Sequence, residues 1–219
     1  MGTIEVTGKG AVYVKPDVTR LEVTVECVFD DYSSAYKQAS ENTSWMSKIL
    51  EFNHKPGTLA KTIRFDISDH EENDYDSKGH YLGKTIDGYE WIQVFMVDLP
   101  IGNELVNKIV RGVGKFIPGA QIDISYTVQD MRPVQLKMIR RAVEDAREKA
   151  SIMAIAVGCQ LGEVEQITYH SGCLAIQSQA RSIHSDSEAK MSTVDSLNIT
   201  PDDLVISDNI DVVWKLINQ

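Results

Sequence analysis

The sequence predicts an α+β fold in which helices cover an antiparallel sheet of long strands. Two observations lead to this prediction. Segments in which apolar and polar residues alternate come in consecutive pairs, and three segments with apolar residues at helical spacing separate these pairs. Consecutive strand pairs are typical of antiparallel hairpins, whereas regular alternation of strands and helices would favour a parallel sheet. The predicted order of elements is β-β-α-β-β-α-β-α-β-β.

The chain is expected to begin with two strands and a helix. The strands cover residues 3–15 and 18–29, and Pro16-Asp17 between them is a turn signal. In the second strand alternate residues are apolar, which predicts a strand with one buried face. A helix follows over residues 32–52, where apolar side chains recur at helical spacing.

A long hairpin over residues 61–99 is expected next. Its second strand, over 81–99, places large apolar side chains on one face. These side chains are Tyr89, Trp91, Phe95 and Val97. The connection, residues 70–79, is acidic and polar, and we interpret it as a solvated hairpin tip. It could bind Ca²⁺, but it lacks the ligand order of a calcium-binding loop. The candidate ligands are His70, Glu71, Glu72, Asp74, Asp76 and His80.

The second half of the chain is expected to contain two helices and three strands. These elements are, in order, a helix over 103–117, a strand over 122–128, a long helix over 131–157, and strands over 164–169 and 204–217. The long helix has a stripe of mostly small side chains, which indicates close packing on a sheet or another helix. Its expected buried residues are Ile139, Ala142, Val143, Ala146, Ala150, Met153, Ala154 and Val157. Residues 171–200 lack periodicity, which predicts a long loop or an ordered excursion.

Composition limits the partners of this chain of 219 residues. The net charge is −10 and the isoelectric point is about 4.9. Nucleic acid or an anionic membrane would need a basic surface, so both partners are disfavoured. No stretch approaches the roughly 20 apolar residues of a membrane span, so we expect none. The length fits a single domain over residues 1–219, within which two α+β subdomains could be intertwined.

The N-terminal sequence and the cysteines indicate a cytoplasmic location. Residues 1–15 contain neither the basic nor the apolar segment of a signal peptide. The three cysteines are Cys27, Cys159 and Cys173. An odd and low number is typical of a reducing compartment and argues against a disulfide framework. We therefore expect a cytoplasmic protein that works without disulfides.

The strongest candidate for a metal site is a set of two cysteines and two histidines. Its residues are Cys159, His170, Cys173 and His184, which are residue types that suit zinc. Their spacing does not match a compact zinc finger, and a predicted strand separates the first residue from the others. Cys173 and His170 could form a nucleophile pair, but residues three positions apart on or after a strand are not placed to share a proton. We therefore expect no catalytic, cofactor-binding or metal-binding residue, and no enzyme activity.

Several short motifs occur in an order that resembles the SIMPL-domain family, and the ordered set is more specific than any one motif. The motifs are Gly8-x-Gly10, Pro16-Asp17, Gly88-Tyr89, the alanine-rich helix around residues 141–150, Gly158-x-x-Leu161-Gly162, and Pro201-Asp202-Asp203-Leu204 before the last strand. The resemblance covers nearly the whole chain. We interpret the glycines and the Pro-Asp pair as turn and close-approach positions rather than as reactive groups.

The resemblance implies an α+β fold, a bacterial source and assembly into large homo-oligomers. The family includes periplasmic immunogenic and oxidative-stress-defence proteins, but this chain resembles the signal-less, cytoplasmic-type members. No catalytic residues carry over from the family. Our leading hypothesis is a non-enzymatic, self-assembling scaffold or interaction module. The alternatives are a protein that binds a small molecule or peptide beside residues 171–200, and a metal- or thiol-dependent enzyme that uses Cys159, His170 and Cys173.

Overall fold

The computed structural model confirms the α+β class and the predicted order of the long elements. It describes residues 2–53, 60–169, 175–177, 181–184 and 200–218. The chain forms two compact units, each built from segments that are distant in the sequence. Unit 1 consists of Met1–Asp17, Tyr126–Gln179 and Pro201–Gln219, and unit 2 consists of Val18–Ser125 and Ala180–Thr200.

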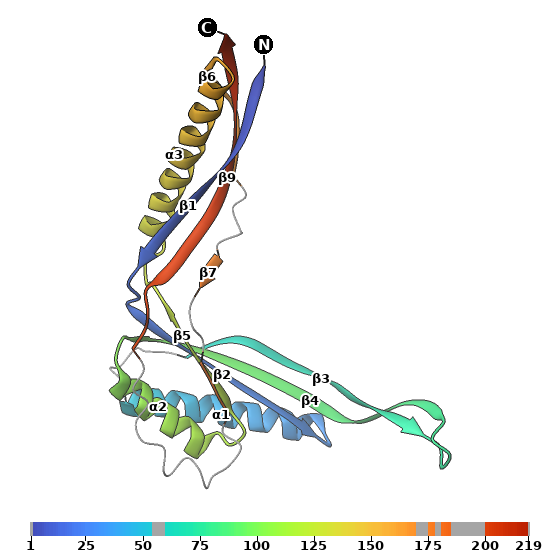
Figure 1. The fold of residues 1–219 in the computed structure, drawn as a ribbon. Helices are drawn as coiled ribbons and strands as arrows, with labels where there is room; N and C mark the ends of the chain where they lie inside the picture. Colours follow the sequence, from blue (N-terminus) through green and yellow to red (C-terminus); the bar gives the residue numbers. More distant parts are fainter. Residues whose placement is uncertain (1, 54–59, 170–174, 178–180, 185–199, 219) are drawn as a thin grey trace. The chain divides into compact units, whose positions relative to one another are not determined.

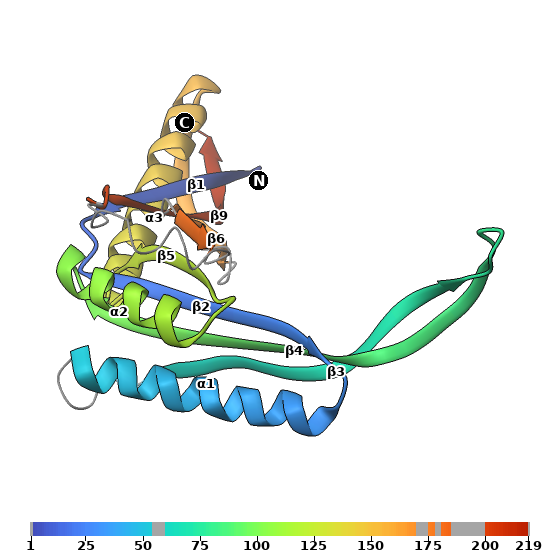
Figure 2. The same ribbon diagram turned by 90° about the horizontal axis from the view of Figure 1, so that it is seen from below.

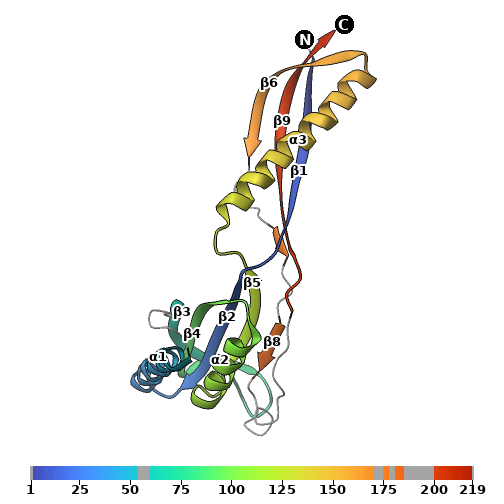
Figure 3. The same cartoon turned by 90° about the vertical axis from the view of Figure 1, so that its left-hand side faces the viewer.

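Unit 1 is an antiparallel sheet with one long helix on one face (Figure 1). The strand order is β1-β9-β6, and β7 pairs with β9 as well. The strands are β1 (Thr3–Val14), β6 (Cys159–Tyr169), β7 (Ala175–Gln177) and β9 (Leu204–Asn218), and the helix is α3 (Arg132–Ala156). Figure 3 shows α3 running alongside β1 and β9. The helix buries the sheet face to which the even-numbered residues of these two strands point, Val6 and Trp214 among them.

The helix α3 lies so close to β1 that two strand positions accept only glycine. A Cβ atom on Gly8 would overlap the carbonyl oxygen of Ala142, and one on Gly10 would overlap that of Met138. The helix side of this contact is a row of small side chains. The buried row is Met138, Ala142, Ala146, Ala150 and Ala154. The interpretation of Gly8-x-Gly10 as a close-approach motif is therefore confirmed.

Unit 2 is a five-stranded antiparallel sheet in the order β3-β4-β2-β5-β8, with two helices against it (Figure 2). The strands are β2 (Val18–Phe29), β3 (Lys61–Tyr75), β4 (Tyr81–Pro100), β5 (Gln121–Thr127) and β8 (Arg181–His184). The helices are α1 (Tyr32–Asn53) and α2 (Asn103–Phe116). Trp91, Phe95 and Val97 are fully buried on β4, as their alternation predicts. Stacking of Trp45 on Phe116, with ring centroids 4.6 Å apart, joins the two helices.

The hairpin of β3 and β4 has a longer ladder and a shorter connection than the sequence predicts. Strand β3 continues to Tyr75 and β4 begins at Tyr81, so only residues 76–80 connect them. The prediction that residues 70–79 form the connection is therefore wrong for residues 70–75, which pair with β4. These polar residues form a strand because both faces of the hairpin are exposed here, so the ladder needs no apolar alternation.

Two further predictions need correction. Strand β6 begins at Cys159, because its first residues pair with the end of β9, and shifts in register near Val164 hide the alternation in the sequence. Met153 and Val157, predicted to be buried, are exposed, because α3 buries only the row at four-residue spacing. The short strands β7 and β8 fall within residues 171–200, most of which lie outside the described residues.

Candidate functional site

Of the four residues weighed as a metal site, Cys159 is the one whose side chain the structure describes. Cys159 begins β6, and its Sγ atom lies 3.7 Å from Asn218 Oδ1. His170 and Cys173 lie outside the described residues, and His184 is described only by its backbone at the end of β8. Among the described residues, no group of three or more His, Cys, Asp or Glu side chains could hold a metal ion. Cys159 is thus described as a half-buried thiol at the start of a strand.

The outer end of the hairpin, residues 70–88, is largely exposed, and we call it the arm. Strand β2 stops pairing with β4 at the Phe29–Tyr89 pair, so beyond this point β3 and β4 have no strand partner but each other among the described residues. Figures 1 and 2 show the arm continuing past the end of β2 and of α1. The arm carries large apolar side chains that are more than half exposed. They are Tyr75, Tyr81, Leu82 and Ile86.

Short-range polar pairs hold the arm together. His70 Nδ1 lies 2.6 Å from Asp87 Oδ1, and Lys84 Nζ lies 2.7 Å from Glu71 Oε2. The hydrogen bond to Asp87 raises the pKa of His70. At the turn, the backbone N–H groups of Lys78 and His80 both donate to the Asp76 carboxylate.

The contacts at the turn and the ion pairs between β3 and β4 leave two acidic side chains of the arm without a basic partner among the described residues. Asp76 also contacts the His80 ring, with 2.9 Å between Asp76 Oδ2 and His80 Nδ1. The hydrogen bonds from the backbone and ring of His80 lower the pKa of Asp76. These bonds give the Asp76 carboxylate a structural role at the turn. The two acidic side chains without a cation are Glu72 and Asp74, which share one face of β3.

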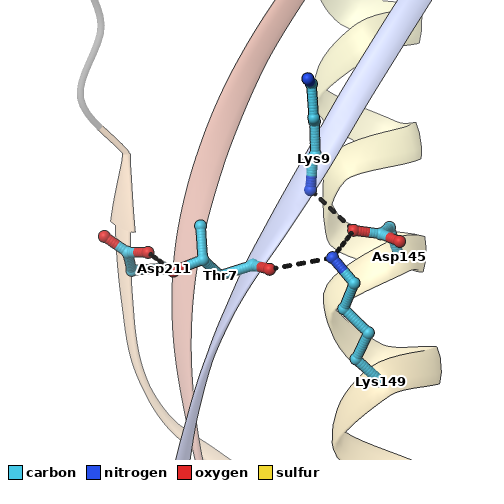
Figure 4. A network of polar contacts seen from close by, with 5 residues as sticks. All are labelled: Thr7, Lys9, Asp145, Lys149 and Asp211. Atoms are coloured by element: carbon cyan, nitrogen blue, oxygen red, sulfur yellow. Dashed lines mark hydrogen bonds and ion pairs between the residues drawn. The ribbon is translucent and has the colours of Figure 1, made fainter.

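A second surface of interest is the outer edge of β1, where side chains of α3 bind the strand backbone. Within the described chain β1 pairs only with β9, so its other edge has no strand beside it. The backbone N–H of Lys9 donates to Asp145 Oδ2 at 2.7 Å, and Lys149 Nζ donates to the carbonyl of Thr7 at 3.3 Å (Figure 4). Arg141 donates to the carbonyl of Ala11 at 2.6 Å.

These contacts form a ladder because helix and strand repeats nearly match. The helix residues are four apart, which is a rise of about 6.0 Å in an α-helix. Their strand partners are two apart, which is about 6.8 Å in an antiparallel strand. The ladder consists of Arg141 with Ala11, Asp145 with Lys9, and Lys149 with Thr7. An edge whose backbone groups already bind side chains is a poor template for a further strand.

Because of Asp145, the stability that the ladder contributes depends on pH. Hydrogen bonds from Lys149 and from the Lys9 N–H lower the pKa of Asp145 below its usual 3.8. The folded pKa is depressed, so the contribution of Asp145 to stability is present above pH 3.8 and is lost as the pH falls through the folded value. Replacing Asp145 with Asn should lower the free energy of unfolding at pH 7 by about 0.5–1 kcal/mol, since the group is partly exposed.

The measurement is urea unfolding of the wild type and of Asp145→Asn at pH 7 and at pH 3. The difference between them should shrink at the lower pH. Glu148→Gln is the matched control, because Glu148 lies on the same helix, is exposed and has no ion pair within the described chain. An equal loss in Glu148→Gln would show that the net charge of the helix, rather than the ladder, is responsible.

The N-terminal half of α3 presents a basic surface. Residues 132–143 contain four cations and no carboxylate. Arg132, Lys137 and Arg140 are exposed, and no ion pair within the described residues involves them. Arg132, Leu136 and Arg140 follow one another at four-residue spacing, so they lie in a row along the helix. Leu136 in the middle of this row is 53% exposed.

One buried carboxylate was missed by the sequence reasoning. Asp208 is 6% exposed, and its Oδ2 atom has no hydrogen-bond partner among the described residues. Burial and the neighbouring Asp208 carboxylate raise the pKa of Tyr169. The signal was present in the sequence, because Asp208 occupies an inward position between Ile206 and Ile210 on the alternating strand β9.

Comparison with known proteins gives a family for the chain. No helix in the described residues is both long and apolar enough to cross a membrane. A search of curated proteins finds no match. The model of the SIMPL family, described as a protein of unknown function (DUF541), matches residues 4–214, a span that includes both glycines of the close approach, the arm and the whole of α3. This chain therefore belongs to the SIMPL family.

Proposed function

We propose that this protein is a non-enzymatic, self-assembling scaffold or interaction module, and that the arm is its main contact with other copies. The observation that carries the proposal is the arm itself. A two-stranded hairpin is marginally stable in water, and this one exposes two tyrosines, a leucine and an isoleucine. Exposed apolar groups gathered in one place are typical of protein–protein contact sites.

The edges of the two sheets support contact through the arm rather than through β1. The β1 edge is closed by side chains of α3, so strand addition there would break three ladder contacts. Strand β3 is the end strand of its sheet and has a backbone edge with no neighbouring strand in the described residues. Its exposed Ile63 and Phe65 extend the apolar surface from the arm toward the rest of unit 2.

The proposal includes a cytoplasmic location and function without bound metal. Cys27 and Cys159 are free thiols, which suits a reducing compartment. Burial raises the pKa of Cys27, and the nearby Glu26 carboxylate adds to this effect, so Cys27 is a weaker nucleophile than an ordinary thiol.

The test of self-assembly is the mass of the protein in solution with and without the arm. Light scattering on the wild type at tens of micromolar, roughly where weak association is detectable, should give a multiple of the chain mass of 24.5 kDa. A variant in which Asn-Gly replaces residues 72–85 keeps Glu71 opposite Ile86 and closes a two-residue hairpin loop. We expect this variant to have the mass of one chain.

Two outcomes would contradict the proposal. A monomeric wild type at this concentration would rule out self-assembly as the function. If the arm-shortened variant assembles like the wild type, the contact between copies lies outside the arm. The apolar end of α3, where Ile152, Ile155 and Val157 are exposed, would then be the next surface to mutate.

A further inference from the structure

We propose that the arm of one molecule docks on the basic N-terminal half of α3 in a second molecule. This inference rests on the proposed self-assembly and names the two surfaces that meet. Its starting point is charge. The arm, residues 70–88, contains five carboxylates and two lysines, whereas residues 132–143 contain four cations and no carboxylate in a chain whose net charge is −10.

Both surfaces carry charges that the described residues do not neutralise. In the arm, Lys84, His70 and His80 each pair with one carboxylate, which leaves Glu72 and Asp74. On α3, neither Arg132 nor Arg140 has an ion pair within the described chain. A contact between these groups would therefore form new ion pairs without breaking existing ones.

The two charged rows differ in length. Glu72 and Asp74 are two residues apart on a strand, or about 6.8 Å. Arg132 and Arg140 are eight residues apart, or about 12 Å along the helix, with Leu136 between them. The long arginine side chains can reach inward along the helix to bridge this difference.

The contact between the two surfaces is mainly polar. Glu72 and Asp74 stand opposite Thr85 and Gly83, whereas Ile86 stands opposite Glu71 and therefore points to the other face of the arm. On the helix, Leu136 is exposed between the two arginines. The long aliphatic stems of the arginines supply the remaining apolar contact.

A second copy fits the basic row better than nucleic acid does. A nucleic acid is attracted by a strongly basic surface, and the net charge of −10 opposes its approach. The acidic arm is present in a one-to-one ratio with the basic row in every assembly of this chain. Ion pairs between the two would also fix which surfaces meet, since like charges in contact are strongly unfavourable.

The test uses two charge-reversed variants of the full chain, and each of them alone should assemble less readily than the wild type. One carries Glu72→Lys and Asp74→Lys, so its arm and its helix are both basic. The other carries Arg132→Glu and Arg140→Glu, so the row on its helix is acidic like its arm. We expect the protein concentration at half-assembly to rise at least about tenfold for each variant alone. A one-to-one mixture should assemble as the wild type does, because each arm then meets a helix of opposite charge.

Circular dichroism shows whether each variant is folded, and a third variant controls for net charge. It carries Lys37→Glu and Arg111→Glu, which reverse two exposed cations on α1 and α2. This control should assemble like the wild type. Assembly of the wild type should also weaken in 1 M salt, where the screening length is about 3 Å.

The possible failures are distinguishable. A monomeric wild type would overturn both the proposed function and this inference. If the wild type assembles and the charge-reversed variants do so equally well, self-assembly stands and this inference is wrong. It is also wrong if the two variants dissociate but their mixture does not reassemble. Binding of a single-stranded RNA oligonucleotide that depends on Arg132 and Arg140, with assembly unchanged, would assign the basic row to nucleic acid instead.

Discussion

Replacing Gly8 with alanine is expected to destabilise the protein by about 3 kcal/mol, at the upper end of the usual range for overpacking. The reason is the position of the new methyl group, which would overlap the carbonyl oxygen of Ala142. The obstacle is helix backbone rather than the end of a flexible side chain, so the strain can be relieved only by moving α3 away from β1. Gly10→Ala should have an effect of the same size, because its methyl group would meet the carbonyl oxygen of Met138.

The control for this experiment is Gly2→Ala, just before the same strand. A Cβ atom on Gly2 would lie 3.8 Å from Leu216 Cδ1, which is ordinary van der Waals contact. The three variants can be compared by urea unfolding followed by circular dichroism. If Gly8→Ala and Gly2→Ala unfold at the same urea concentration, then α3 does not lie directly on the β1 backbone.

The sequence predicts the elements of this fold where one face of a strand or helix is buried. Alternation identifies β2 and β4 and the burial of Trp91 and Phe95, because a sheet with one covered face requires apolar residues at every second position. The sheet-facing stripe of α3 is predicted for Ala142, Ala146 and Ala150 for the same reason. Gly8-x-Gly10 can be interpreted as a close approach because little else explains glycine inside a strand.

The same reasoning fails where burial imposes no pattern. Residues 70–75 form a strand with both faces exposed, so their polar side chains resemble a loop in the sequence. The charged ladder could not be predicted either. Arg141, Asp145 and Lys149 are typical of a solvated helix face, and only the fold places them against the backbone of β1. Contacts between segments more than a hundred residues apart leave no local signal.

Replacing Trp214 with alanine is expected to lower the free energy of unfolding by about 3–5 kcal/mol, whereas shortening the arm should leave it nearly unchanged. Trp214 is 4% exposed on β9 and belongs to the buried cluster between β1, β9 and α3, to which α3 contributes Ala142, Ala146 and Ala150. Its removal therefore leaves a cavity beside a helix whose buried side chains there are too small to fill it.

The matched control for the tryptophan is Tyr13→Ala, an aromatic residue on the neighbouring strand that is 70% exposed and should be nearly neutral. Urea unfolding followed by circular dichroism compares Trp214→Ala, Tyr13→Ala and the variant in which Asn-Gly replaces residues 72–85. If the shortened arm unfolds the protein while Trp214→Ala does not, the arm belongs to the folding core, and it could not serve as a free surface for another molecule. If Trp214→Ala is strongly destabilised and the variant with the shortened arm is stable but monomeric, the arm contributes to assembly and not to folding stability. Its exposed side chains then make no stabilising contact within their own molecule.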